Sequence, residues 1–108
     1  MTTPRVEVPI LASLPRPEEE TSESLARRLG YDGRFLKAVR ESQGMSIEAL
    51  SQATRISRRY LEAIEDNGFE RLPAATFVRG YVKEIVRELD IEHTDALQGF
   101  MNLFKQHR

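Results

Sequence analysis

The residues that could do chemistry in this chain are arginines placed for contact with phosphate. Arg58 and Arg59 fall in the first turn of a predicted helix, where the helix dipole favours anionic side chains instead. Ser57 precedes them with a hydroxyl group, and Arg55 and Arg34 could enlarge the cationic patch. Arginine and serine side chains contact the DNA backbone, and arginine also reads base edges. These five residues are therefore the candidate nucleic-acid-binding set.

Acidic side chains on and after the same predicted helix oppose that function. Glu62, Glu65 and Asp66 follow the arginines directly, and Glu70 comes soon after. Carboxylates that face a phosphate backbone repel it, so the few arginines should bind DNA weakly and lose affinity steeply with salt. A DNA-binding regulator that uses 57–66 as its recognition helix remains one of the alternatives.

The sequence offers no constellation for catalysis, for a cofactor or for a metal. His93 and His107 have no second histidine at ligand spacing, there is no cysteine, and no glycine-rich phosphate loop is present. The acidic run 18–20 lies in the predicted flexible tail without a shaped pocket, so it is not an acid–base pair. We therefore expect a binding protein and not an enzyme.

Two parts differ in composition within the 108 residues. Four of the five prolines lie in the first 17 residues, which predicts a flexible Pro-rich tail over 1–20 and a helical domain over 21–108. In the tail, Val6, Val8 and Ile10 alternate and could add as an edge strand to a partner's sheet, or have no role. With a net charge of −1 and no apolar run of about 18 residues, we expect a cytoplasmic protein without a membrane span.

Helical spacing of apolar residues continues from Thr21 to the end of the chain. Thr21 or Ser22 should cap a short first helix that ends at Gly30, and Pro73 should occupy the first position of a long helix. Thr94 should cap the last helix. The predicted helices cover 22–29, 33–43, 47–54, 58–66, 73–89 and 95–106.

The stretch 45–65 has the composition of a helix-turn-helix. Two short capped helices flank a turn, Ser51 is small where the second helix crosses the first, and Ile56 is an apolar plug in the turn. This pattern predicts two short helices that are joined by a tight turn and cross closely at Ser51.

At this point residues 33–92 resemble the helix-turn-helix domains of the RodZ type, a branch of the λ-repressor-like fold. The residues that carry the resemblance are LKAVRESQGMS (36–46), ATRISRRYLEAIE (53–65), FERLPA (69–74), FVRGY (77–81) and LDI (89–91). The combination of FxxLP with FVRGY is not a feature of ordinary repressor domains. The resemblance implies an all-α, five-helix λ-repressor-like domain, here with an extra short N-terminal helix.

The resemblance also implies a function as an adaptor that docks on the actin-like filament protein MreB. In that family the contact lies around an aromatic pair that Phe77 and Tyr81 match, and Arg79 and Lys83 could meet acidic groups of the partner. The alternative is that both rings belong to the core. Gly80 between them is expected to admit a neighbouring helix of the same domain.

Two further expectations follow from the resemblance and from the last helix. In the wider fold an ion pair matching Arg40 and Glu65 ties the first core helix to the recognition helix. The last helix carries more apolar residues than one buried face requires, so a homodimer through 97–104, with Phe100, Leu103 and Phe104 at its centre, is a third alternative.

Overall fold

The computed structural model describes residues 21–91 and 95–107, and within these residues all regular structure is helical. The expected tail 1–20, with its alternating Val6, Val8 and Ile10, lies outside the described residues, as do His93 and the expected cap Thr94. The expected all-α class and its extra N-terminal helix are confirmed. The elements are α2 (Ser22–Leu29), α3 (Gly33–Ser42), α4 (Ile47–Thr54), α5 (Arg58–Glu65), the short 3-10 turn η3 (Phe69–Arg71), α6 (Ala75–Glu88) and α7 (Asp95–Gln106).

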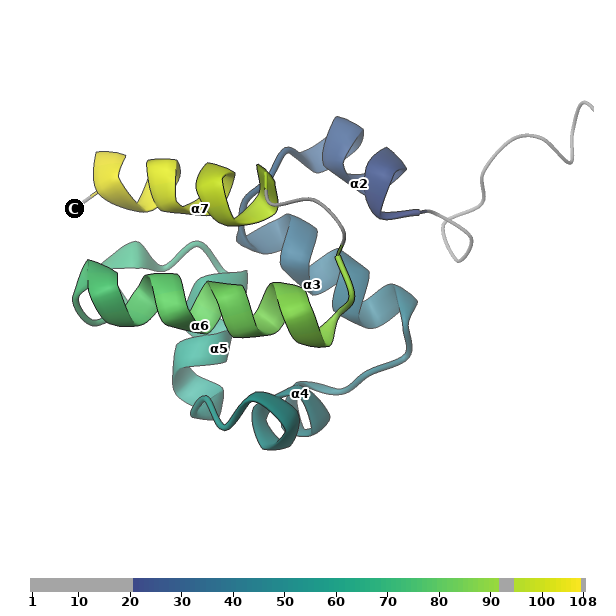
Figure 1. Ribbon diagram of the computed structural model, residues 1–108, viewed down its shortest axis with the longest axis horizontal. Coiled ribbons are helices and arrows are strands. Elements are labelled where there is room, and N and C mark those ends of the chain that lie inside the picture. Colours follow the sequence, from purple (N-terminus) through teal and green to yellow (C-terminus); the bar gives the residue numbers. More distant parts are fainter. Residues whose placement is uncertain (1–20, 92–94, 108) are drawn as a thin grey trace, which may run out of the picture.

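The longest helix, α6, lies between α7 and α4. Figure 1 shows α6 and α7 side by side and antiparallel, with α4 on the side of α6 away from α7 and α2 packed on α3. The buried stripe of α6 consists of Val78, Val82 and Ile85 and continues to Leu89, so its residues follow one another at intervals of four, three and four. Each of these side chains is almost completely buried, so α6 joins the helix-turn-helix to α7 through one core.

Side-chain caps set where the helices begin. Thr21 caps α2 in a reciprocal box with Ser24, while Ser46 and Ser57 accept hydrogen bonds from backbone N–H groups of α4 and α5. Asp32 caps α3 in the same way. The cap satisfies N–H groups that the first turn of a helix leaves without partners, which explains why these short helices begin at these residues.

The start of α6 differs from the expectation. Pro73 is not its first residue, because Ala74 is extended (ψ 154°) and the helix begins at Ala75. Proline favours an extended conformation in the residue before it, and Leu72 is indeed extended. The link from η3 is therefore extended at Leu72 and Ala74, on both sides of Pro73, before α6 begins.

The turn of the helix-turn-helix is held by side-chain hydrogen bonds. The Ser51 hydroxyl donates to the carbonyl of Ile56 at 2.6 Å, and the Thr54 hydroxyl donates to the carbonyl of Leu50 at 2.7 Å and accepts from the Ile56 N–H. Ile56 is buried as expected. Arg55 closes α4 in a left-handed conformation (φ 64°), which lets the chain change direction before α5 begins three residues later.

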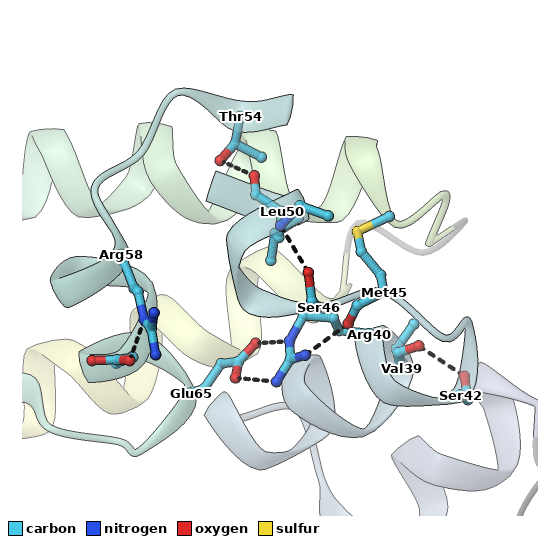
Figure 2. A network of polar contacts seen from close by, with 11 residues as sticks. Val39, Arg40, Ser42, Met45, Ser46, Leu50, Thr54, Arg58 and Glu65 are labelled. Atoms are coloured by element: carbon cyan, nitrogen blue, oxygen red, sulfur yellow. Dashed lines mark hydrogen bonds and ion pairs between the residues drawn. The ribbon is translucent and has the colours of Figure 1, made fainter. Parts of the chain in front are cut away.

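The expected ion pair between Arg40 and Glu65 is formed in the interior. Figure 2 shows the guanidinium group facing the carboxylate with two parallel hydrogen bonds, 2.7 and 3.0 Å long. A third N–H of Arg40 donates to the carbonyl of Met45 at 2.8 Å. The hydrogen bond with Glu65 raises the pKa of Arg40 above its ordinary value, and only 10% and 6% of the two side chains are exposed. One arginine thus joins α3, the end of α5 and the loop that leads to α4.

The additional apolar residues of α7, beyond those that one buried face requires, pack largely inside the domain. Phe100, Met101 and Phe104 are buried, and Phe69 of η3 contacts the rings of Phe100 and Phe104 at centroid distances of 5.6 and 6.3 Å. The surface expected for a homodimer therefore lacks its two phenylalanines, because both lie in the core. Leu103 and Leu97 stay half-buried.

We predict that Glu65→Ala lowers the free energy of unfolding by about 3–5 kcal/mol, because the charge of Arg40 is then left buried without its partner. Urea unfolding followed by circular dichroism measures this value. Glu84→Ala, which removes an exposed pair with Arg87, is the control and should change stability by less than about 1 kcal/mol. Equal losses in the two variants would contradict a special role for the buried pair.

Candidate functional site

Phe77 is the one large apolar side chain that is exposed among the described residues. Its exposed fraction is 60%, and it lies in the first turns of α6. The core alternative for this ring is therefore wrong. A phenylalanine left in water forgoes about 1.5–3 kcal/mol of burial, so the exposed ring is a candidate anchor for a partner.

Tyr81 lies one helical turn after Phe77 and is half-buried. Its ring stacks on that of Tyr60 in α5, with centroids 5.7 Å apart and planes inclined by 26°. Sequence reasoning missed Tyr60, because the contact joins residues 21 positions apart and no local spacing reveals it. Phe77, Tyr81 and Tyr60 together form an aromatic surface, which crosses from α6 to the first turn of α5.

The structure does not bring Arg79 and Lys83 to this aromatic surface. With 3.6 residues per turn, they lie about 200° and 240° around the α6 axis from Phe77, on the other flank of its exposed arc. Both side chains are exposed, and neither forms an ion pair within the described residues. The four residues expected to form one site are thus divided between two flanks of the helix.

Gly80 has no packing role in the domain, contrary to the expectation. A Cβ atom built on it meets no heavy atom within 4 Å, and its φ is not positive. The position is exposed because it lies on the solvent side of α6, between the turns that carry Phe77 and Tyr81. The close helix crossing occurs instead at Gly33, where a Cβ would lie 1.9 Å from the carbonyl oxygen of Ile64.

Two carboxylates neutralise Arg58. Its guanidinium group forms ion pairs with Glu62 one turn later, at 2.9 Å, and with Glu48 of α4. The hydrogen bond with Glu62, followed by the charge of Glu48, raises the pKa of Arg58 above its ordinary value. Arg58, one of the arginines expected to contact DNA, is therefore already paired with carboxylates of its own domain.

The other candidates for DNA contact divide into two groups. Arg34 pairs with Asp32 at 3.0 Å and donates to the carbonyl of Leu29, and the Ser57 hydroxyl oxygen caps α5. Arg55 and Arg59 are exposed and form no ion pair within the described residues. Two of the four expected arginines, Arg55 and Arg59, thus remain without an ion pair near the helix-turn-helix, so the expected cationic patch is reduced.

No group of three or more potential metal ligands occurs among residues 21–91 and 95–107. None of the helices in the same part of the chain has the length and hydrophobicity of a membrane span. His107 stacks on the Phe69 ring, with centroids 5.0 Å apart. The features of the described surface that suggest a site are therefore the aromatic rings and the free arginines.

A family of helix-turn-helix domains matches residues 35–96, which is more than half of the chain. The chain belongs to this family. The domain is of the type found in RodZ, so the resemblance carried by FVRGY and the preceding motifs is confirmed. No solved structure gives a significant match to the chain.

Two relatives of this RodZ-type domain are much longer proteins. The cytoskeleton protein RodZ of Streptococcus pneumoniae (strain ATCC BAA-255 / R6) is 28% identical over 68 residues, which cover 63% of this chain and 25% of the relative. An uncharacterized membrane protein of Bacillus subtilis (strain 168), YmfM, is 33% identical over 64 residues, or 59% of this chain and 20% of the relative. The chain spans a quarter or less of the length of these relatives.

We predict that the double variant Glu48→Gln/Glu62→Gln binds duplex DNA more tightly than the wild type, because it frees Arg58. Each additional phosphate that the domain neutralises should steepen the fall of log affinity with log salt by about 0.9. Fluorescence anisotropy with a labelled DNA duplex at several salt concentrations measures both quantities. Glu84→Gln/Glu88→Gln changes the net charge equally but away from α5, and an equal rise in affinity there would show that only total charge matters.

Proposed function

We propose that this RodZ-type domain is a protein-docking module that binds an actin-like MreB filament at the cytoplasmic face of the membrane. The observation that supports this proposal most directly is the exposed ring of Phe77 on α6. The naming of one relative as a cytoskeleton protein supports the class of partner, and the membrane protein among the relatives supports the location.

The geometry around Phe77 suits an interface anchor. The ring protrudes from a helix whose opposite side is fixed in the core by Val78 and Val82, so little conformational entropy is lost when a partner covers it. Tyr81 is held by its stack on Tyr60 and presents a ring and a hydroxyl group at the edge of the same surface. Rigid aromatic residues of this kind carry a large part of the energy of protein interfaces.

Arg79 and Lys83 have a secondary role in this proposal. Because they lie on the other flank of α6, they attract an acidic partner from a distance and contact only its rim. Their removal should slow association more than it weakens the bound complex. Phe77 and Tyr81 remain the centre of the site.

The two alternative functions have less support from the structure. DNA binding through 57–66 would rely on Arg55 and Arg59, because Arg58 and Arg34 are paired with carboxylates of the domain. Self-association through 97–104 would rely on half-buried Leu97 and Leu103, since the phenylalanines of α7 are buried. We expect a monomer in sedimentation experiments.

We predict that Phe77→Ala raises the dissociation constant for polymerised MreB of the same organism about 30-fold, the effect of an anchor worth about 2 kcal/mol. Its thermal unfolding midpoint should hardly change, because the ring makes few contacts within the domain. Co-sedimentation with the filaments measures the affinity. Leu103→Ala, an apolar truncation on α7, is the control and should bind like the wild type.

Two results would contradict the proposal. One is that the wild-type protein does not sediment with the filaments. The other is that Phe77→Ala and Leu103→Ala bind equally well, which would place the contact elsewhere on the domain.

A further inference from the structure

No contact or backbone conformation within the described domain requires a glycine at position 80. Glycine in the interior of an exposed helix destabilises the helix relative to alanine, because the unfolded chain gains conformational freedom. Here neither a positive φ nor a close neighbour requires glycine, since a Cβ would meet nothing within 4 Å. A residue that weakens its own helix without a reason inside the fold indicates a contact outside it.

The position of Gly80 indicates which contact that is. Residues three or four apart share a helix face, so Gly80 lies beside Phe77 at i+3 and beside Glu84 at i+4. The absence of a side chain leaves the backbone of α6 bare next to the exposed ring. Another chain can therefore approach α6 more closely at Gly80 than at any neighbouring exposed position that carries a side chain.

The aromatic surface extends in the other direction to Arg59 on α5. The guanidinium carbon of Arg59 lies 5.8 Å from the centre of the Tyr60 ring, and Tyr60 in turn stacks on Tyr81. Within the described residues Arg59 has no carboxylate partner, whereas its neighbour Arg58 has two. Arg59 thus carries an uncompensated charge at the edge of an apolar surface, with its hydrogen-bond donors unused in the described ion pairs.

Charge distinguishes a protein partner from a nucleic acid on this surface. Glu84 and Glu88 are exposed and follow Gly80 and Tyr81 along the same side of α6. A phosphate backbone laid along this side would meet two carboxylates, and the Phe77 ring would gain nothing from it. A protein segment can place one carboxylate at Arg59 and an apolar side chain at Phe77. It then pairs the charge of Arg59 and covers the exposed ring of Phe77.

We infer that the docking surface, whose existence rests on the proposed function, spans α6 and the first turn of α5. Its occupant is a protein segment with one apolar and one carboxylate side chain, whose main chain packs against α6 at Gly80. An apolar side chain of that segment covers Phe77, and a carboxylate binds Arg59. Gly80 sets how closely the segment approaches, and Arg59 sets which segment is accepted.

The test of Gly80 compares two variants that add the same side chain to opposite flanks of α6. Gly80→Gln should raise the dissociation constant for polymerised MreB at least 10-fold, because the new side chain holds the partner away from the helix. Ala75→Gln, about 140° away around the axis, should stay within two-fold of the wild type. Gly80→Ala should raise the thermal unfolding midpoint by a few degrees, which shows that the domain itself does not need the glycine.

The test of Arg59 compares it with a cation on the other flank. Arg59→Glu should weaken binding more than 10-fold and reduce its dependence on salt, while Arg79→Glu, with the same change of charge, should weaken it less than three-fold. Equal losses would show that only net charge matters and would overturn the assignment of Arg59. Gly80→Gln binding as tightly as Ala75→Gln would overturn the close approach at α6.

The outcomes also separate this inference from the proposed function. Wild-type protein that does not sediment with the filaments overturns both. Wild-type binding that is lost in Phe77→Ala but is unchanged in Gly80→Gln and Arg59→Glu preserves the proposed function and overturns the inference.

Discussion

The buried ion pair between Arg40 and Glu65 fixes the position of α5, and the candidate site depends on that position. The two side chains meet in a fork that permits one orientation of α5 against α3, and the bond to the Met45 carbonyl adds the start of α4 to the same unit. Apolar contacts alone would tolerate small rotations of such short helices. A buried pair of charges does not, because any displacement leaves a desolvated charge without its partner.

The aromatic surface depends on this fixed orientation of α5. With the end of α5 held by Glu65, its first turn presents Tyr60 to α6, where the ring meets Tyr81. Gly33 contributes to the same constraint, since only a residue without Cβ lets α3 approach the carbonyl of Ile64 so closely. A surface made by two helices can act as one site only when their mutual orientation is fixed, and the interior provides that orientation.

The helices could be predicted from the sequence because their signals are local, whereas side-chain partners could not. Periodic apolar residues and polar caps define each helix within one or two turns. The expected boundaries therefore differ by two residues at Pro73 and by one residue at the ends of α3, α5 and α6. Arg58 pairs with Glu48 in another helix, and no spacing on its own helix reveals that neutralisation. A helical glycine such as Gly80 is compatible with close packing or with an open surface, and only the neighbouring helices distinguish the two. Likewise the phenylalanines of α7 exceed the needs of one helix face until Phe69 of η3 packs beside them.

The distribution of paired and unpaired charges explains why a helix-turn-helix can serve protein docking. The turn of α5 that enters the major groove in DNA-binding relatives of this motif here carries a neutralised Arg58 and a Tyr60 that packs sideways on α6. Glu62 follows on the exposed side and opposes phosphate. A groove-binding helix needs its first turn free and positively charged. In this domain that turn is joined to α6 by an aromatic stack, so its remaining cation, Arg59, lies at the edge of an apolar surface that a second protein can cover.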